Sequence, residues 1–242
     1  MQLRQQLRQD NQAALGAVDQ LKAAQLRLQQ WSLALPVRSD LHIARKIWHA
    51  STGILIVSLY AAGFSQEMAI FILSGLLFLT LALELTRMKN PVLNEKCVRF
   101  FGAIIRTNEV KKFSTVPYYL ASAIFAIGVF PKPVAILSML YLAVGDPSAS
   151  FFGVLFKKKS VKIFGEKSLH GTAACFAVCA LMTFFYLRSG GMVGLELIRL
   201  TLLGGFAGAL AEALPLELDD NFTIPVVSGL ILWAGLLVIH FV

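Results

Sequence analysis

The sequence predicts an all-α membrane protein, and three observations support this fold class. Of the 242 residues, 57% are hydrophobic and only 15% are charged, with a mean hydropathy of +0.68. This composition is too apolar for a soluble domain of the same length. The apolar residues form continuous runs of about 17 or more, the length that a helix needs to cross a bilayer. The runs lack the period-two alternation of membrane β-barrel strands, so we expect a polytopic helical bundle.

The N-terminal residues 1–40 are polar and Gln-rich and precede the first apolar run. Small or apolar side chains recur there in a loose heptad, which contains Gly16 and is interrupted by Asp10. This pattern predicts an amphipathic helix in the cytoplasm or on the membrane surface, with a self-association coil as the alternative. We expect residues 1–40 to form one domain and residues 41–242 to form the integral membrane domain.

Apolar runs in residues 41–242 predict about seven transmembrane helices. They cover residues 47–64, 68–85, 114–130, 133–156, 169–187, 192–214 and 222–242. Between the second and third runs, residues 92–112 mix apolar and basic side chains and are too charged to span. This segment suits an amphipathic helix on the inner membrane surface. The small residues 204–213 in the sixth run suit close packing between helices.

The net charge of +8 follows from the topology. With a cytoplasmic N-terminus and seven crossings, all of the 22 Lys and Arg residues except Lys132, Arg188 and Arg199 fall on the cytoplasmic side. Such asymmetry is the positive-inside bias of membrane proteins. We therefore expect no nucleic-acid partner. The protein is expected in the inner membrane of a bacterial cell, or in the endoplasmic reticulum or a plastid membrane of a eukaryotic one.

The same topology gathers polar residues at the cytoplasmic ends of the spans. They are Arg45, Lys46 and His49 at the first span, Glu84 and Arg87 at the second, Lys167, Ser168 and His170 at the fifth, Glu212 at the sixth, and Asp219, Asp220 and Asn221 before the seventh. Asp146 of the fourth span is expected between this group and the membrane midplane.

Asp146 is the most informative of these residues, since a carboxylate inside a span costs roughly 2.5–3.5 kcal/mol and normally meets a cation, a metal or a proton. Glu212, in a helix of small residues, supports a similar argument. Structural alternatives exist for the others. Arg45 and Lys46 can be anchors at the membrane interface, and Asp219 to Asn221 can form a helix cap.

Acids that need cations, beside lysines and helix N-termini that attract anions, describe a metal–nucleotide phosphate site. The chain has no GxxxxGK[ST] motif, so a nucleotide would bind in another way. A substrate that reaches a site among membrane helices is expected to be a lipid. These residues indicate phosphoryl or nucleotidyl transfer to a lipid at the cytoplasmic face.

Four motifs in this order resemble the polyprenol kinase family, which includes dolichol kinase, phytol kinase and CTP-dependent diacylglycerol kinase and is related to the CDP-diacylglycerol synthases. The motifs are RKIWH at 45–49, GDPSAS at 145–150 followed by Gly153, KSLHG at 167–171, and AEALPLELDDNFTIPVVSG at 211–229. Glu84, Arg87 and Glu109 also resemble family positions. His170 is a departure, because many members have an acid there.

The resemblance implies a membrane kinase that transfers the γ-phosphate of CTP to the hydroxyl of a lipid alcohol, with Mg²⁺ or another divalent cation. Asp146 and either Asp219 or Asp220 would hold the metal. The nucleotide would contact Lys167 and Ser168, with Arg45 and Lys46 as a second cationic wall. The metal shell or nucleotide would be oriented by Glu212 and Asn221, and a carboxylate or His49 would accept the proton of the lipid hydroxyl. The expected partners are thus the lipid alcohol, the nucleotide and membrane lipids.

Two other functions remain open from the sequence. A CDP-lipid synthase of the phosphatidate cytidylyltransferase kind would use the same nucleotide with a lipid phosphate. An ion-coupled transporter would use Asp146 and Glu212 as coupling groups, although the chain shows no internal repeat of the usual transporter kind.

Overall fold

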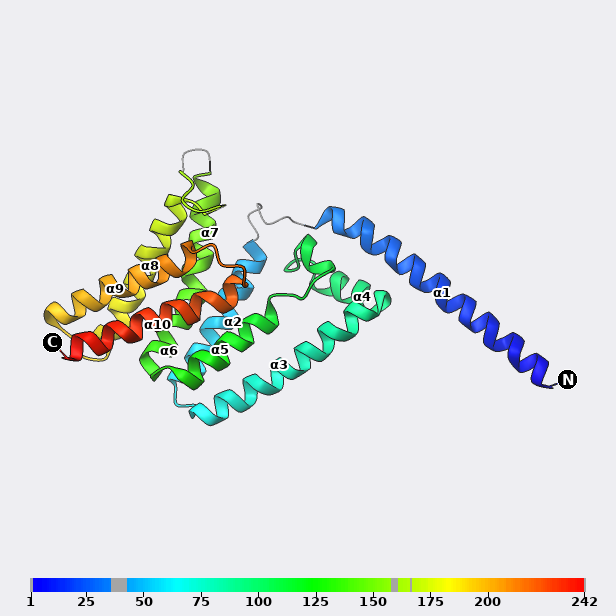
Figure 1. Ribbon diagram of the computed structural model, residues 1–242, viewed down its shortest axis with the longest axis horizontal. Helices are drawn as coiled ribbons and strands as arrows, with labels where there is room; N and C mark the ends of the chain where they lie inside the picture. The colour runs from blue at the N-terminus through cyan, green and yellow to red at the C-terminus, as the bar shows by residue number, and fades with distance from the viewer. Residues whose placement is uncertain (1, 36–42, 158–160, 166, 242) are drawn as a thin grey trace. The chain divides into compact units, whose positions relative to one another are not determined.

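The computed structural model describes residues 2–35, 43–157, 161–165 and 167–241, and this part of the chain is helical as predicted (Figure 1). The α-helices are α1 (Gln2–Ala34), α2 (Ile43–Ala61), α3 (Gln66–Lys89), α4 (Pro91–Phe101), α5 (Val116–Val129), α6 (Lys132–Leu140), α7 (Asp146–Leu155), α8 (Leu169–Ser189), α9 (Gly194–Ala213) and α10 (Asp220–Phe241). A 3₁₀ turn, η1 (Thr107–Val110), and a π-helical segment, η2 (Tyr141–Gly145), complete the elements.

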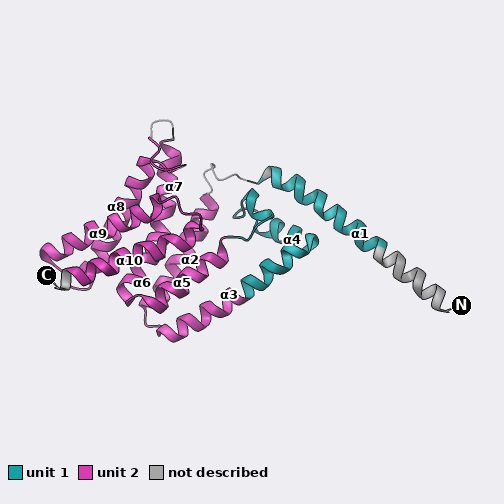
Figure 2. Ribbon diagram, viewed as in Figure 1, with its two compact units in different colours: residues 1–40, 79–114 teal, residues 41–78, 115–242 magenta. Residues whose placement is uncertain are grey.

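The chain divides into two compact units (Figure 2). Unit 1 comprises residues 1–40 and 79–114, and unit 2 comprises residues 41–78 and 115–242. The predicted N-terminal helix is present as α1 and shares unit 1 with the second half of α3, with α4 and with η1.

In unit 1 the C-terminal part of α1 packs against α4 and η1. Leu28 is buried with Val98 and Val110 in a small apolar core. At the rim of this core Arg27 makes a bidentate ion pair with Glu95, with Nε–Oε1 and Nη2–Oε2 distances of 2.6 and 2.9 Å. The hydrogen bond from Arg27 lowers the pKa of the Glu95 carboxyl below its ordinary value. The predicted amphipathic segment after the second span thus contributes α4, which buries Val98 in this core and leaves Phe100 exposed.

The centre of unit 1 is the buried guanidinium of Arg87. It pairs with Glu84 on the preceding turn of α3, at 2.6 Å between Nη2 and Oε2. It also donates to Asn94 Oδ1 (3.0 Å) and to the backbone carbonyls of Glu109 (3.1 Å) and Lys112 (2.8 Å). Since a buried guanidinium is tolerated only when its charge and donors are satisfied, this network explains the two charged residues at the end of the second apolar run.

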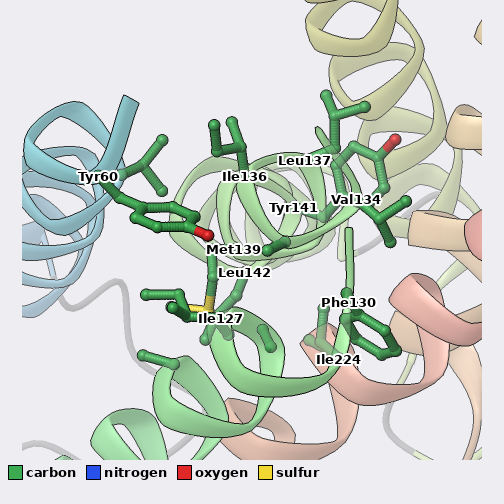
Figure 3. Close-up of a cluster of buried hydrophobic side chains, with 14 of the residues drawn as sticks. Tyr60, Ile127, Phe130, Val134, Ile136, Leu137, Met139, Tyr141, Leu142 and Ile224 are labelled. Carbon is green, nitrogen blue, oxygen red and sulfur yellow. The ribbon is translucent and has the colours of Figure 1, made fainter. Parts of the chain in front are cut away.

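Unit 2 is organised around a rod formed by α6, η2 and α7, which together make one helical stretch from Lys132 to Leu155. Tyr141, Leu142 and Ala143 in its middle are fully buried. Figure 3 shows the side chains around it, including Ile127 and Phe130 from the α5 region and Ile224 from α10. The rod is therefore the core element of unit 2, and its packing fixes the positions of the side chains along it.

The rod widens into a π-helix immediately before Asp146 and Pro147. Proline lacks the N–H of a regular helix, and its ring clashes with the carbonyl four residues earlier. The five-residue segment η2 accommodates this defect, with the Asp146 N–H bonded to the Tyr141 carbonyl. Pro147 thus distorts the helix without ending it, and π-helical turns are frequent at functional sites.

Small residues bring α8 and α9 together. A side chain at Gly204 would overlap Thr183 Oγ1 and Tyr141 Oη, and one at Gly208 would overlap Cys179 Sγ. The predicted role of the 204–213 segment in close helix packing is therefore confirmed. Cys175 and Cys179 are buried free thiols against Gly145 of η2, where they serve as packing residues.

Five described helical segments are long and apolar enough to cross a membrane: Gln66–Lys89, Lys132–Leu155, Leu169–Ser189, Gly194–Ala213 and Asp220–Val238. The chain is thus an integral membrane protein. The other two predicted spans differ: α2 has a polar first turn that contains Arg45 and Lys46, and α5 has 14 residues. Fourteen residues extend about 21 Å, against a hydrocarbon core of about 30 Å. The count of seven spans is therefore not confirmed by length and composition.

Candidate active site

A short hairpin between α7 and α8 holds Lys167 in place. Its arms meet at a bridge between Lys162 and Ser168, with hydrogen bonds from Ile163 N to Lys167 O (3.0 Å) and from Leu169 N to Val161 O (2.9 Å). The Ser168 hydroxyl then caps α8 by accepting from Gly171 N at 3.2 Å. Backbone pairing and the helix cap thus fix the direction of the Lys167 side chain. Of the neighbouring lysines, Lys158 and Lys159 lie outside the described residues.

Lys167 lies between carboxylates from two other helices. Its Nζ is 3.0 Å from Glu212 Oε1 in α9 and 3.1 Å from Asp220 Oδ2 at the start of α10. Thr172, one turn into α8, donates to the second oxygen of Glu212 at 3.1 Å. The structure therefore brings together three predicted site residues from separate parts of the chain. We call Lys167, Glu212, Asp220 and Asp146 the acid–lysine cluster.

The cluster is largely removed from water, since the exposed fractions of the side chains are 19% for Lys167, 6% for Glu212 and 27% for Asp220. Burial by itself lowers the pKa of a lysine. Here the negative charges of Glu212, Asp146 and Asp220 outweigh it and raise the pKa of Lys167 above its ordinary value. Lys167 is therefore a permanent cation in this site.

Asp146 joins this group from the rod. It is the first residue of α7, directly after η2, and its charge acts on both Lys167 and Glu212. Glycines allow the close approach of α7 to α8, because a side chain at Gly171 would lie 2.6 Å from the Ala149 carbonyl and one at Gly153 would lie 3.0 Å from Ser168 Oγ. The carboxylate of the fourth predicted span thus lies close enough to Lys167 for their opposite charges to interact, which offsets part of the cost of placing an acid in a span.

Asp219 and Asn221 shape the start of α10. Asp219 Oδ1 accepts from the backbone N–H of Asn221 at 2.9 Å and also from the Asn221 side-chain amide. The Asp219 carbonyl accepts from Phe222 N and Thr223 N. This arrangement is the helix cap that the sequence offered as the structural alternative, and it holds Asp220 next to Lys167.

The predicted residues of α2 have contacts with α5. Arg45 Nη2 donates to Thr115 Oγ1 at 2.9 Å, and the His49 ring packs edge-on against Tyr119 with ring centroids 4.9 Å apart. One turn on, a side chain at Gly53 would overlap the Tyr119 hydroxyl and lie 2.5 Å from Ala143 Cβ. Gly53 thus allows α2 to pack closely against η2, the segment that ends at Asp146. His170, the departure from the family motif, is stacked on Phe156 with centroids 5.2 Å apart.

Sequence reasoning missed Thr172 and Tyr119. Thr172 lies four residues after Ser168 in a predicted span, so helical spacing from the KSLHG motif could have identified it. Tyr119 carries no such signal. Its position beside His49 depends on the packing of α5 on α2.

The oxygen donors of the site are suited to magnesium. Within the described residues, no group of three or more His, Cys, Asp or Glu side chains is arranged to hold a metal by itself. Magnesium commonly takes one or two protein carboxylates and completes its shell with substrate phosphates and water. Asp146 and Asp220 of the acid–lysine cluster supply carboxylates of this kind, whereas the Oδ1 atom of Asp219 is engaged in the cap of α10.

The protein is thus a helical membrane protein with a buried cluster of one lysine and several carboxylates. Membrane proteins with such a cluster form a class suited to phosphoryl chemistry on lipids. No protein-family model and no solved structure matches the chain. It is 31% identical over 206 residues to CTP-dependent diacylglycerol kinase 1 of Saccharomyces cerevisiae, covering 78% of this chain and 71% of the relative.

Two further relatives carry the same name. The one from Eremothecium gossypii is 30% identical over 224 residues (85% of this chain, 70% of the relative). The one from Schizosaccharomyces pombe is 29% identical over 200 residues (79% and 92%). The chain belongs to the family of CTP-dependent diacylglycerol kinases, and the resemblance stated from its motifs is confirmed.

Proposed function

We propose that the protein is a CTP-dependent kinase that phosphorylates the hydroxyl of a membrane lipid alcohol, and that diacylglycerol is the acceptor. The names of its three relatives support both the nucleotide and the acceptor. The observation that carries the proposal is the acid–lysine cluster. It supplies a fixed cation at the capped N-terminus of α8 and carboxylates from three other elements.

The reaction requires a bond from the lipid oxygen to the γ-phosphorus of CTP, with cleavage of the β–γ bridge and release of CDP. Lys167 and the N-terminus of α8 capped by Ser168 would bind the phosphate oxygens, since both present positive charge to anions. Arg45 and Lys46 would form a second cationic wall. The proton of the lipid hydroxyl would pass to a carboxylate of the cluster or to His49.

Mg²⁺ would be held by Asp146 together with Asp219 or Asp220. When bound, it would neutralise charge on the β- and γ-phosphate oxygens. Glu212 and Asn221 would keep the surrounding groups in orientation, Glu212 through its contacts with Lys167 and Thr172 and Asn221 through its contact with Asp219.

The proposal includes a topology. Residues 41–242 would form the catalytic membrane domain, with seven spans in which α2 and α5 complete the five long apolar segments. The N-terminus and the acid–lysine cluster would face the cytoplasm, as the distribution of basic residues predicts. The membrane itself would be the inner membrane of a bacterium, or the endoplasmic reticulum or a plastid membrane of a eukaryote.

The test uses the purified full chain in detergent micelles with γ-labelled CTP, Mg²⁺ and a panel of diacylglycerol, polyprenol and phytol. We expect label to enter diacylglycerol in the wild type and to be lost in Asp146→Asn. Asp19→Asn, a substitution of an exposed acid in α1, is the matched control and is expected to leave the rate unchanged.

Two results would overturn the proposal. One is transfer of label from α-labelled CTP into a CDP-lipid when phosphatidate is supplied, without transfer to any alcohol, which identifies a cytidylyltransferase. The other is absence of transfer from either label in a folded preparation, which would direct attention to ion-coupled transport through Asp146 and Glu212.

A further inference from the structure

The hydroxyl of Tyr119 is a buried polar group that the proposed phosphate chemistry does not use. Tyr119 lies in α5 and is 6% exposed, and its Oη atom has no hydrogen-bond partner among the residues that the structure describes. A buried hydroxyl without a partner costs free energy, which a phenylalanine of the same shape would avoid. The hydroxyl therefore indicates a partner from outside the polypeptide.

Helix α2 runs antiparallel to the rod, so its first turns lie beside the part of the rod that carries Asp146. At the start of the rod, Lys132 Nζ lies 4.9 Å from the ring centroid of Tyr60, near the end of α2. Further along the rod, Ala143 meets Gly53, which is earlier in α2, because a side chain at Gly53 would lie 2.5 Å from Ala143 Cβ. The side of the rod at Ala143 therefore faces α2.

Asp146 lies between the α2 side and the α8 side of the rod. It is three residues after Ala143, which faces α2, and three residues before Ala149, whose carbonyl meets α8. Residues three apart are neighbours on a helix surface, so Asp146 borders both sides. In phosphoryl transfer the attacking and leaving oxygens are roughly in line. With the nucleotide held at Lys167 on the α8 side, the acceptor hydroxyl is expected to approach from the α2 side.

The Tyr119 hydroxyl lies at the depth of the polar groups next to the acceptor's hydroxyl. A side chain at Gly53 would overlap both this hydroxyl and Ala143, so the hydroxyl is level with Ala143. That level is about 4–5 Å from Asp146, toward the middle of the spanning segment. In a diacylglycerol the ester carbonyls are a few bonds from the free hydroxyl, on the side of the acyl chains. A lipid whose free hydroxyl is at Asp146 thus brings an ester carbonyl to the level of Tyr119.

We propose that the Tyr119 hydroxyl donates a hydrogen bond to an ester carbonyl of the acceptor and so selects diacylglycerol over alcohols without an ester. The inference rests on the proposed kinase function for the position of the reacting hydroxyl. A buried donor disfavours a substrate that lacks the matching acceptor group, since the donor then stays unpaired. The backbone at Gly53 covers the Tyr119 hydroxyl, so α2 moves slightly outward when the carbonyl binds.

The kinetic test compares a diacylglycerol with the dialkylglycerol of the same chain length, in which ethers replace both esters, in mixed micelles with γ-labelled CTP. Tyr119→Phe keeps the ring that packs against His49 and removes only the hydroxyl. We expect the wild type to prefer the diester in kcat/KM by about tenfold, the effect of one hydrogen bond, and Tyr119→Phe to lose this preference with an unchanged KM for CTP. Tyr118→Phe, the same change at the neighbouring exposed tyrosine, should keep the preference.

An unchanged preference for the diester in an active Tyr119→Phe variant would overturn the proposal and leave the kinase function standing. Absence of transfer to either lipid by the wild type would instead contradict the kinase function. The thermal unfolding midpoint of Tyr119→Phe should equal or exceed that of the wild type, because the hydroxyl has no protein partner to lose. A lower midpoint would reveal such a partner and would also overturn the proposal.

A second measurement does not depend on catalysis. Diacylglycerol with isotope-labelled ester carbonyls is bound to the full chain in micelles without CTP, and the carbonyl stretch is compared between wild type and Tyr119→Phe by infrared difference spectroscopy. We expect a hydrogen-bonded carbonyl band at lower frequency in the wild type that is missing in the variant. Identical spectra would overturn the proposal even if the kinase is active. The band without phosphate transfer would support the lipid site and contradict the kinase.

Discussion

Lys167 shows how one side chain can join distant parts of the chain. Its ammonium contacts Glu212 of α9 and Asp220 of α10. It also interacts electrostatically with Asp146 of α7. Each of these acids would be costly in a span by itself. Lys167, held by its hairpin, interacts favourably with all three, so this residue matters to stability as well as to the proposed phosphate binding.

Replacement of Lys167 by Met is therefore expected to destabilise the protein by about 3 kcal/mol, since breaking a buried ion pair leaves uncompensated charge. Phosphate transfer should fall by at least a hundredfold. The double variant Lys167→Met/Glu212→Gln should recover much of the thermal unfolding midpoint without recovering activity. Recovery of activity in the double variant would show that Lys167 serves stability alone.

The raised pKa of Lys167 predicts a pH dependence. A group whose pKa is higher in the folded state contributes its full stability below the unfolded pKa, here 10.5, and loses it as pH rises through the folded value. The difference in unfolding midpoint between wild type and Lys167→Met should thus be constant from pH 8 to 9.5. A difference that shrinks within this window, measured by thermal scans in detergent, would contradict the assigned environment.

Arg87 offers a contrast within unit 1. Its side chain is 3% exposed and bonds to one carboxylate, one amide and two backbone carbonyls. Arg87→Ala should cost about 3–5 kcal/mol, because Glu84 is left buried without its partner. Arg27→Ala, which removes an exposed ion pair in the same unit, should leave the unfolding midpoint unchanged. Equal losses in the two variants would refute the distinction.

At the scale of elements, the rod Lys132–Leu155 links the core to the site. Its middle is packed on all sides, whereas its C-terminal part carries Asp146 toward α8 and α9. The π-helical segment η2 inserts one extra residue per turn and so changes the direction in which Asp146 projects. The geometry of the site thus depends on a local irregularity that Pro147 imposes.

Pro147→Ala is expected to restore a backbone N–H and allow a regular α-helical turn. The unfolding midpoint should stay the same or rise, because a proline in a helix interior is costly. The rate of phosphate transfer should fall at least tenfold, since Asp146 would rotate away from Lys167. Pro133→Ala, in the first turn of α6 where no intrahelical donor is needed, is the control and should leave the rate unaffected.

At the scale of the whole molecule, the two ends of α8 mark the two opposite ends of the membrane domain. Its 21 residues extend about 32 Å, enough to cross the hydrocarbon core. Lys162 and Ser189 are exposed near its opposite ends. The proposed topology places Lys162 and the acid–lysine cluster in the cytoplasm and Ser189 on the other side.

Single cysteines at these positions test the orientation, in a background in which Cys97, Cys175 and Cys179 are replaced. In sealed right-side-out vesicles, a membrane-impermeant maleimide should label Ser189→Cys directly and Lys162→Cys only after permeabilisation. The reverse pattern would invert the topology. Labelling of both without permeabilisation would mean that α8 does not span the membrane.

The sequence by itself determined the fold class, the apolar segments and the residue types of the site. Long apolar runs without period-two alternation cross lipid as helices, because a helix satisfies every backbone polar group within the segment. Charged residues stand out in such runs because placing them inside the membrane costs much free energy. For the same reason Asp146, Lys167 and Glu212 are recognisable from the amino-acid pattern alone.

Only the tertiary structure decided how these residues are combined. The pairing of Lys167 with Glu212 and Asp220 depends on the packing of α8 on α9 through Gly204 and Gly208 and on the packing of α10 on α9, which a linear pattern does not encode. The same holds for Thr172, for the placement of Arg45 against Thr115, and for the position of the Tyr119 hydroxyl over Gly53. These features arise from contacts between segments far apart in the chain, where shape complementarity and close packing select one arrangement among many.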